Sequence, residues 1–239
     1  MPSRNRRSPR RWKYPDDQGH RLDLPDVLSR VKDHGPNHYS GLYNVMKGVT
    51  LAGGGIAFVR LANHGFSLPH IALMAVALTG VFLTYYGQSV GLVIVHLKPS
   101  ILDIALPMAL TVVEFFIVYR PGAPAKGALP VDWFYALAIW ALLAASVVAS
   151  VANRISRFDY SSRLWPVANE YRSELWRDVG AASVLAVVTA AFAAAHQAWA
   201  LDTTWEYAFL AVALGMLFAG INSQGQTRRI LAKHLALPV

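Results

Sequence analysis

Apolar residues along this chain gather into six long runs, which are separated by shorter polar or glycine- and proline-containing stretches. A helix needs about 20 apolar residues to cross the ~30 Å hydrocarbon core of a bilayer. We therefore expect an all-α integral membrane protein, built as a bundle of six transmembrane helices. The predicted spans are about 42–61, 69–95, 101–119, 133–152, 179–199 and 205–222.

Polar sequence precedes and follows these spans and separates the fourth from the fifth. Residues 1–40 predict a basic leader with a short amphipathic helix, because apolar residues recur at helical spacing in LDLPDVLSRVKDH. Residues 41–222 form the predicted transmembrane domain, and residues 223–239 form a basic tail with its own short amphipathic helix. A third amphipathic helix is expected in the loop between the fourth and fifth spans, from Pro166 onward, and is expected to run into the fifth span.

Composition supports this assignment to the membrane. Of the 239 residues, 54% are hydrophobic and only 15% are charged, and the mean hydropathy is +0.33. Soluble domains are about 25% charged, so this chain has too much apolar surface for a single soluble core. The chain contains no cysteine, which excludes disulfides, thiol catalysis and cysteine metal sites.

Lysine and arginine are distributed unevenly between the two predicted sides of the membrane. Most of the 22 basic residues fall in the leader, in the loop between the fourth and fifth spans, and in the tail. Cytoplasmic loops carry such an excess of lysine and arginine. We therefore expect both termini in the cytoplasm. Alanine-, arginine- and valine-rich usage without cysteine is typical of a bacterial inner membrane protein.

These basic segments account for the net charge of +8 without any nucleic-acid-binding module. We therefore do not expect nucleic acid as a partner. The anionic inner leaflet of the bilayer attracts such segments, and a soluble cytoplasmic protein is the alternative partner for them. The residues expected to contact lipid or this partner are Arg6, Arg7, Arg10, Arg11, Arg154 and Arg157.

The third span carries two carboxylates, which makes it the main candidate for chemistry. On a helix that turns about 100° per residue, Asp103, Thr111 and Glu114 fall roughly on one face. Ionisable groups at membrane depth usually face the bundle interior or a water-filled cavity, and they often mark function. The candidate pathway or ligand-binding residues are therefore Glu114, Thr111, Asp103 and, from the first span, Lys47. Pro107 predicts a kink in the third helix.

Each of these charged residues also has a structural interpretation. Glu114 is either a buried partner for Arg60 or Arg120, or a pathway residue. Asp103 either caps the first turn of its helix or pairs with Lys47. Lys47 has a further alternative, in which its long side chain reaches the lipid headgroups.

Two further patterns concern helix packing and capping. Small residues recur along one stripe of the second span, at Gly80, Thr84, Gly87 and Gly91. We expect the three glycines to let a neighbouring helix approach closely. At the start of the sixth span, Thr203 and Glu206 have the spacing of a capping box.

The histidines do not predict a metal or haem site. His34 and His38 are four residues apart, but the Gly-Pro pair between them breaks the helix that would bring them together. The histidines near the spans fall at span ends, where His70 and His196 share the predicted outer side. The chain also lacks the motifs of hydrolases and nucleotide-binding loops. We therefore expect no metal and no cofactor, and favour a role other than an enzyme.

Two functional hypotheses follow from these observations. In the first, the protein is a channel or transport-type protein with the acidic stripe of the third span along its path. Because six helices are few for a pore within one chain, this hypothesis favours a homo-oligomer. In the second, the protein is a membrane scaffold, or a subunit of a complex such as a prokaryotic defence or secretion assembly, and docks a soluble partner on its basic face. A membrane enzyme or electron carrier is the third alternative.

Overall fold

The computed structural model describes residues 38–64, 68–94, 101–122, 130–157, 160, 164–199 and 201–235. This part of the chain forms six α-helices and one 3-10 turn. The elements are α2 (His38–His64), α3 (Leu68–Ile94), α4 (Ile101–Tyr119), η1 (Arg120–Gly122), α5 (Val131–Ile155), α6 (Trp165–Trp199) and α7 (Thr203–Leu235). The predicted leader helix, with Arg6, Arg7, Arg10 and Arg11, lies outside the described residues.

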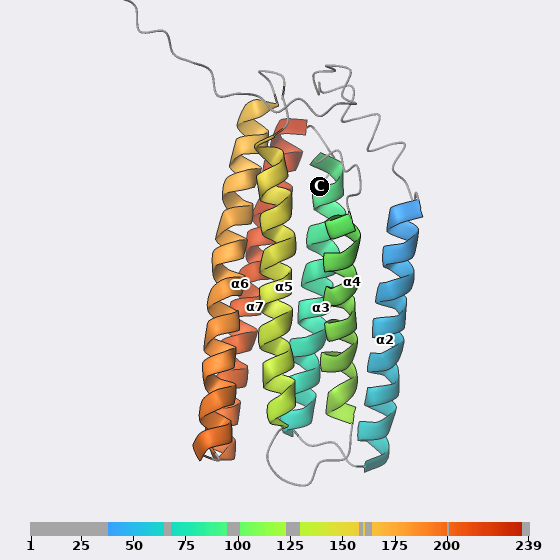
Figure 1. Cartoon of the computed structure of the whole chain (residues 1–239), viewed down its shortest axis with the longest axis vertical. Coiled ribbons are helices and arrows are strands. Elements are labelled where there is room, and N and C mark those ends of the chain that lie inside the picture. The colour runs from blue at the N-terminus through green and yellow to red at the C-terminus, as the bar shows by residue number, and fades with distance from the viewer. Residues whose placement is uncertain are drawn as a thin grey trace, which may run out of the picture.

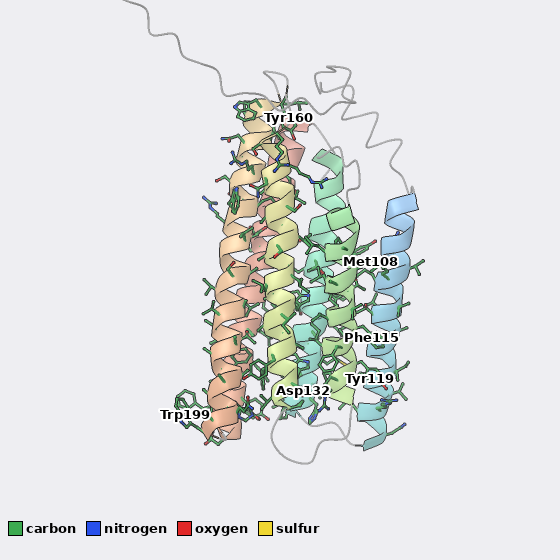
Figure 2. The ribbon with its side chains drawn as sticks, in the orientation of Figure 1. Met108, Phe115, Tyr119, Asp132, Tyr160 and Trp199 are labelled. Atoms are coloured by element: carbon green, nitrogen blue, oxygen red, sulfur yellow. The ribbon has the colours of Figure 1, made fainter. Side chains whose placement is uncertain are left out.

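The helices stand side by side and run alternately up and down (Figure 1). Figure 2 labels Tyr160 at one end of the bundle and Trp199 at the other, and we name the two ends after these residues. The helix α2 lies at one edge and packs mainly against α4, although α3 is its neighbour in the chain. The helices α6 and α7 form the opposite edge, where α6 packs against α5 and α7 packs against α3 and α6.

Five of the described helices, α2, α3, α5, α6 and α7, are long and apolar enough to cross a membrane. The all-helical prediction is therefore confirmed, and five of the six predicted spans have the length and composition needed to cross a bilayer. The apolar part of α4, Ala105–Tyr119, is shorter, but its 19 residues amount to about 28 Å at about 1.5 Å per residue. Large apolar side chains stand exposed on outer faces of the bundle, such as Val112, Val187 and Phe218, as expected of surfaces that meet acyl chains.

The interior of the bundle is built around α5. Its buried residues recur three or four positions apart and include Trp133, Phe134, Leu137, Trp140 and Ala141. This spacing places them along one side of a helix. Their side chains pack with those of α3, α4, α6 and α7 into one continuous apolar core.

A glycine on α3 lets this core close. A Cβ atom added at Gly80 would lie 2.9 Å from Cζ2 of Trp140, which is too close for two carbon atoms. The absence of a side chain at Gly80 therefore makes room for the indole ring. The surroundings of Gly87 and Gly91 lie outside the described side chains.

The two C-terminal helices are the longest in the described part of the chain. The helix α6 has 35 residues and α7 has 33, which correspond to about 52 Å and 50 Å. The helix expected from Pro166 onward runs into the fifth span as predicted, and the two form α6. The short helix expected separately in the tail is instead continuous with α7. Pro166 lies in the first turn of α6, where proline is tolerated, and an isolated glycine costs a helix only about 1 kcal/mol. Neither residue type therefore ends these helices.

Candidate functional site

Lys47 on α2 and Glu114 on α4 form an ion pair inside the bundle. Nζ of Lys47 binds Oε2 of Glu114. Lys47 is 3% exposed and Glu114 is fully buried. Placing an unpaired charge at membrane depth is costly, and each of these charges compensates the other. The Glu114 side chain therefore faces protein rather than acyl chains.

Thr84 on α3 bridges the two charged groups. Its Oγ1 lies 3.0 Å from Nζ of Lys47 and 2.6 Å from Oε1 of Glu114. A hydroxyl can accept from an ammonium group and donate to a carboxylate at the same time. The Thr84 hydroxyl also lies 3.0 Å from the carbonyl of Val81, which competes with Glu114 for its single proton.

Trp140 on α5 completes the arrangement. Its Nε1 donates to Oε1 of Glu114 over 3.4 Å. The carboxylate thus receives donors from α2, α3 and α5, which matches an ionised, acceptor-only group. We refer to Lys47, Thr84, Glu114 and Trp140 as the Glu114 network.

The structure gives Glu114 a different partner from the two arginines considered for it. Arg120 pairs with Asp132, with 2.9 Å between Nε and Oδ2, and the guanidinium of Arg60 lies 4.7 Å from the centre of the Tyr119 ring. Lys47 reaches Glu114 because α2 packs directly against α4. Arg60 lies about 20 Å farther along α2 at about 1.5 Å per residue. The interpretation of Lys47 as a residue that reaches the lipid headgroups is also wrong, because the side chain is buried.

The remaining candidates of the third span have local roles or lie outside the described side chains. Thr111 is buried, and its hydroxyl donates to the carbonyl of Pro107 over 2.9 Å. Pro107 lies inside α4, and this bond uses the carbonyl of the proline itself. The side chain of Asp103 is not among those described. Arg154 lies in the last turn of α5, and Arg157 is exposed just beyond it; contact with lipid or a partner stays a prediction for both.

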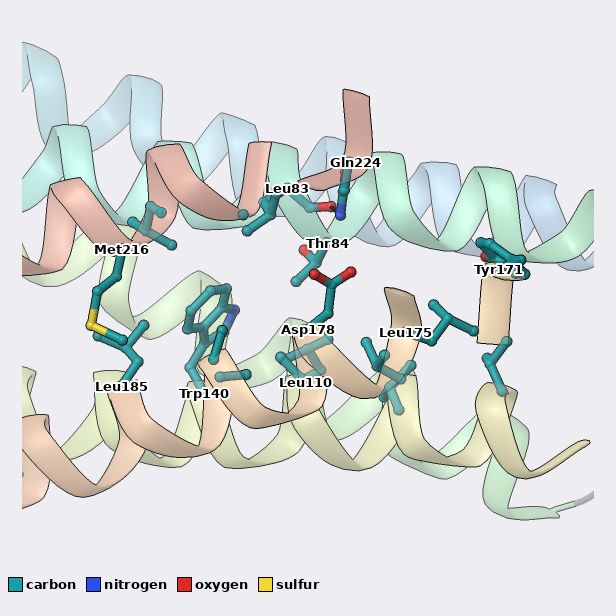
Figure 3. A pocket seen from close by; sticks show the side chains of 18 residues that line it. Leu83, Thr84, Leu110, Trp140, Tyr171, Leu175, Asp178, Leu185, Met216 and Gln224 are labelled. Atoms are coloured by element: carbon teal, nitrogen blue, oxygen red, sulfur yellow. Dashed lines mark hydrogen bonds between the residues drawn. The ribbon is translucent and has the colours of Figure 1, made fainter. Parts of the chain in front are cut away.

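A cavity of about 130 Å³ adjoins the Glu114 network. It lies between α3, α5, α6 and α7, with Leu110 of α4 also on its wall, in the half of the bundle toward the Tyr160 end (Figure 3). Its walls are mostly leucine, valine and alanine side chains. Thr84 and Trp140 line the cavity and also bind Glu114. Anything bound in the cavity would therefore contact two members of the network.

One carboxylate lies on the wall of this cavity. Asp178 on α6 points into its middle, near Thr84 and Gln224 (Figure 3). Its Oδ1 accepts a hydrogen bond from Oγ of Ser223 on α7 over 2.8 Å. In the described part of the chain, no lysine, arginine or histidine pairs with Asp178. The sequence does not single out Asp178, because it falls just before the predicted fifth span, among the charged residues of the preceding loop.

The bundle is closely packed between the cavity and the Trp199 end. The rings of Phe192 and Phe209 stack with their centroids 4.4 Å apart, and Phe134 meets both edge-on. Each of these residues lies roughly two turns, about 10 Å, beyond the cavity along its helix. We refer to Phe134, Phe192 and Phe209 as the aromatic plug.

A second buried polar pair lies beside this plug. Nε2 of His196 is 3.1 Å from Oε1 of Glu206, and the two side chains are 4% and 2% exposed. Neither ring nitrogen of His196 makes a well-aligned hydrogen bond. Asp202, rather than Thr203, caps the start of α7, because its Oδ1 accepts from the backbone N–H groups of Thr204 and Trp205. The part of Glu206 in the predicted capping box stays a prediction, because the side chain of Thr203 lies outside those described.

The chain matches no family model, and comparisons with curated proteins and with solved structures found no match either. Within the described residues, no group of three or more histidine, aspartate or glutamate side chains is placed to hold a metal ion. The function must therefore be argued from the network, the cavity and the plug.

Proposed function

We propose that this protein is a transport-type membrane protein that binds a small solute in the cavity and moves it across the bilayer within one bundle. The observation that carries the proposal is the sharing of Thr84 and Trp140 between the cavity and the Glu114 network. A binding cavity that contacts a buried ion pair provides a physical link between solute binding and helix arrangement.

The link acts through hydrogen bonds to a buried charge. Thr84 holds one proton, for which Glu114 and the Val81 carbonyl compete. A solute that contacts Thr84 changes this competition, and a hydrogen bond to a charged group is worth about 1.5–3 kcal/mol. Such a difference between the occupied and empty states suffices to shift a conformational equilibrium.

The uneven packing along the bundle supports the same proposal. The cavity lies toward the Tyr160 end, and the aromatic plug closes the route toward the Trp199 end. Transporters commonly keep a binding site near the membrane midplane and open it to one side at a time. In this proposal the described arrangement is the state closed at the Trp199 end. If the N-terminus is cytoplasmic, as the basic residues indicate, that closed end faces outward.

A homo-oligomer and a soluble partner remain part of the proposal as additions to this intrachain path. The outer face of α2 supports an oligomer, because Cβ atoms added at Gly48 and Gly55 would meet nothing within 4 Å. The scaffold alternative is favoured by the length of α6 and α7, of which α6 reaches farthest at the Tyr160 end (Figure 1). Arg177 and Arg229 are exposed on these helices and could contact an acidic partner.

The test is solute flux into liposomes that contain the purified full chain. The solutes are radiolabelled tetramethylammonium, methanesulfonate and erythritol, which represent a cation, an anion and a neutral molecule. We expect at least one of them to enter at least tenfold faster than into protein-free liposomes. If none does, while the protein is folded and inserted, the transport proposal is wrong and the scaffold alternative takes its place.

A further inference from the structure

We infer that the cavity binds a small organic monocation with an apolar surface, such as a quaternary or alkyl-substituted ammonium, and that Asp178 is its counter-ion. This inference names the substrate class of the proposed transport function and rests on that function for the role of the ligand. The binding itself is tested separately from transport.

The volume of the cavity sets the size of the ligand. At about 130 Å³ it is slightly smaller than an engineered protein cavity of about 150 Å³ that stays dry and binds benzene. A ligand with roughly five to eight non-hydrogen atoms fits such a space. Tetramethylammonium falls in this range, whereas nucleotides, peptides and lipids are too large.

The charge of the ligand follows from Asp178. This carboxylate points into a cavity with mostly apolar walls (Figure 3), and in the described residues its one hydrogen-bond donor is the Ser223 hydroxyl. A carboxylate in such surroundings is stabilised by a cation. Lys47, across the cavity wall, is already engaged by Glu114. A positively charged ligand therefore supplies the partner charge for Asp178 that the described side chains do not supply.

The walls fit the apolar part of such a cation. Trp140 and Tyr171 line the cavity toward its two ends, with Thr84 and Asp178 between them (Figure 3). Aromatic faces attract cations, and this attraction is stronger when water is excluded. Inorganic cations prefer several oxygen ligands, and this mostly apolar cavity offers few. Anions are disfavoured because none of the described residues that line the cavity is a lysine or arginine.

The experiment measures equilibrium binding of radiolabelled tetramethylammonium to the purified full chain in detergent. We expect saturable binding at one site per chain. Asp178→Asn keeps the size of the side chain but removes its charge, and should weaken binding at least tenfold. Glu170→Gln is the matched control, because it removes a carboxylate charge from an exposed position on the same helix, outside the cavity lining; its affinity should stay within about threefold of the unmodified chain. tert-Butanol, which has a similar shape without charge, should not compete at equal concentration.

A second variant protects the test against an effect of Asp178→Asn on folding. Ala182 lines the cavity, and Ala182→Leu should fill it and abolish binding without touching the carboxylate. The inference is overturned if the unmodified chain binds no tetramethylammonium, if Asp178→Asn binds it equally well, or if tert-butanol competes equally. Binding without flux would retain this site and contradict the transport function. Flux that is unchanged in Asp178→Asn would retain transport and overturn this site.

Discussion

Lys47 and Glu114 are 67 positions apart in the chain, yet they meet as an ion pair in the middle of the bundle. The pair joins α2, at the edge of the bundle, to α4, its main packing partner. Thr84 and Trp140 extend the contact to α3 and α5. Four helices thus meet at one carboxylate.

Removing one member of the pair should destabilise the fold far more than removing both. Glu114→Leu or Lys47→Met alone leaves an uncompensated buried charge, which costs about 3–5 kcal/mol, whereas apolar replacement of a whole buried pair is often neutral or stabilising. We therefore expect the double variant Lys47→Met/Glu114→Leu to lie within about 1 kcal/mol of the unmodified chain. Unfolding by SDS titration in detergent measures all four proteins. Additive losses in the double variant would show that the two side chains do not interact.

The bridging hydroxyl of Thr84 should stabilise the fold through its hydrogen bonds, independently of the size of the side chain. Thr84→Val keeps the shape and removes a hydrogen bond to a charged group, which should cost about 1.5–3 kcal/mol. Thr84→Ser keeps the hydroxyl and is the control, with an expected loss below about 1 kcal/mol. The same SDS titration measures both. Equal losses would mean that Thr84 contributes packing and that its hydrogen bonds are unimportant.

Gly80 should tolerate no side chain. Gly80→Ala places a methyl group against the buried Trp140 ring, and overpacking of this kind costs about 1–3 kcal/mol. Gly48→Ala on α2 is the matched control, because a Cβ atom there meets nothing within 4 Å. Thermal unfolding should therefore show a lower midpoint for Gly80→Ala only. A lower midpoint for both would indicate a general intolerance of α2 and α3 to alanine.

The aromatic plug should control leakage. Phe192→Ala removes one ring of the stacked pair and should raise entry of the neutral solute erythritol into liposomes at least threefold. Phe218→Ala removes an exposed ring from α7 and should leave this leak unchanged. Equal leakage from both variants would place the plug outside the route.

Hydropathy predicted the helices well because the number of apolar residues needed to cross a bilayer is set by the bilayer itself. The helix expected from Pro166 into the fifth span matches the start of α6 at Trp165, but hydropathy alone placed the start of that span near residue 179, because the first turns of α6 carry polar side chains. The same polar turns concealed Asp178, which the sequence groups with loop arginines and the fold places on a cavity wall.

The pairing of Lys47 with Glu114 could not be predicted from the sequence, for a different reason. Charge at membrane depth singled out both residues as candidates and left the burial of Lys47 open. The choice of partner could not be predicted, because it depends on which helices pack together. Short connections suggest that α2 packs on α3, whereas α2 packs mainly on α4. The sequence grouped Thr84 with the small residues of its stripe for a similar reason. Nothing in that stripe indicates that Thr84 forms a hydrogen bond with Glu114 on another helix.

We propose above all that the Glu114 network takes part in transport and does not only stabilise the fold. The most direct test is tetramethylammonium flux through the double variant Lys47→Met/Glu114→Leu, which keeps the fold while removing both charges. We predict at least a tenfold loss of flux, with the unfolding midpoint and insertion into liposomes unchanged. Flux equal to that of the unmodified chain would contradict the claim and reduce the ion pair to a structural role.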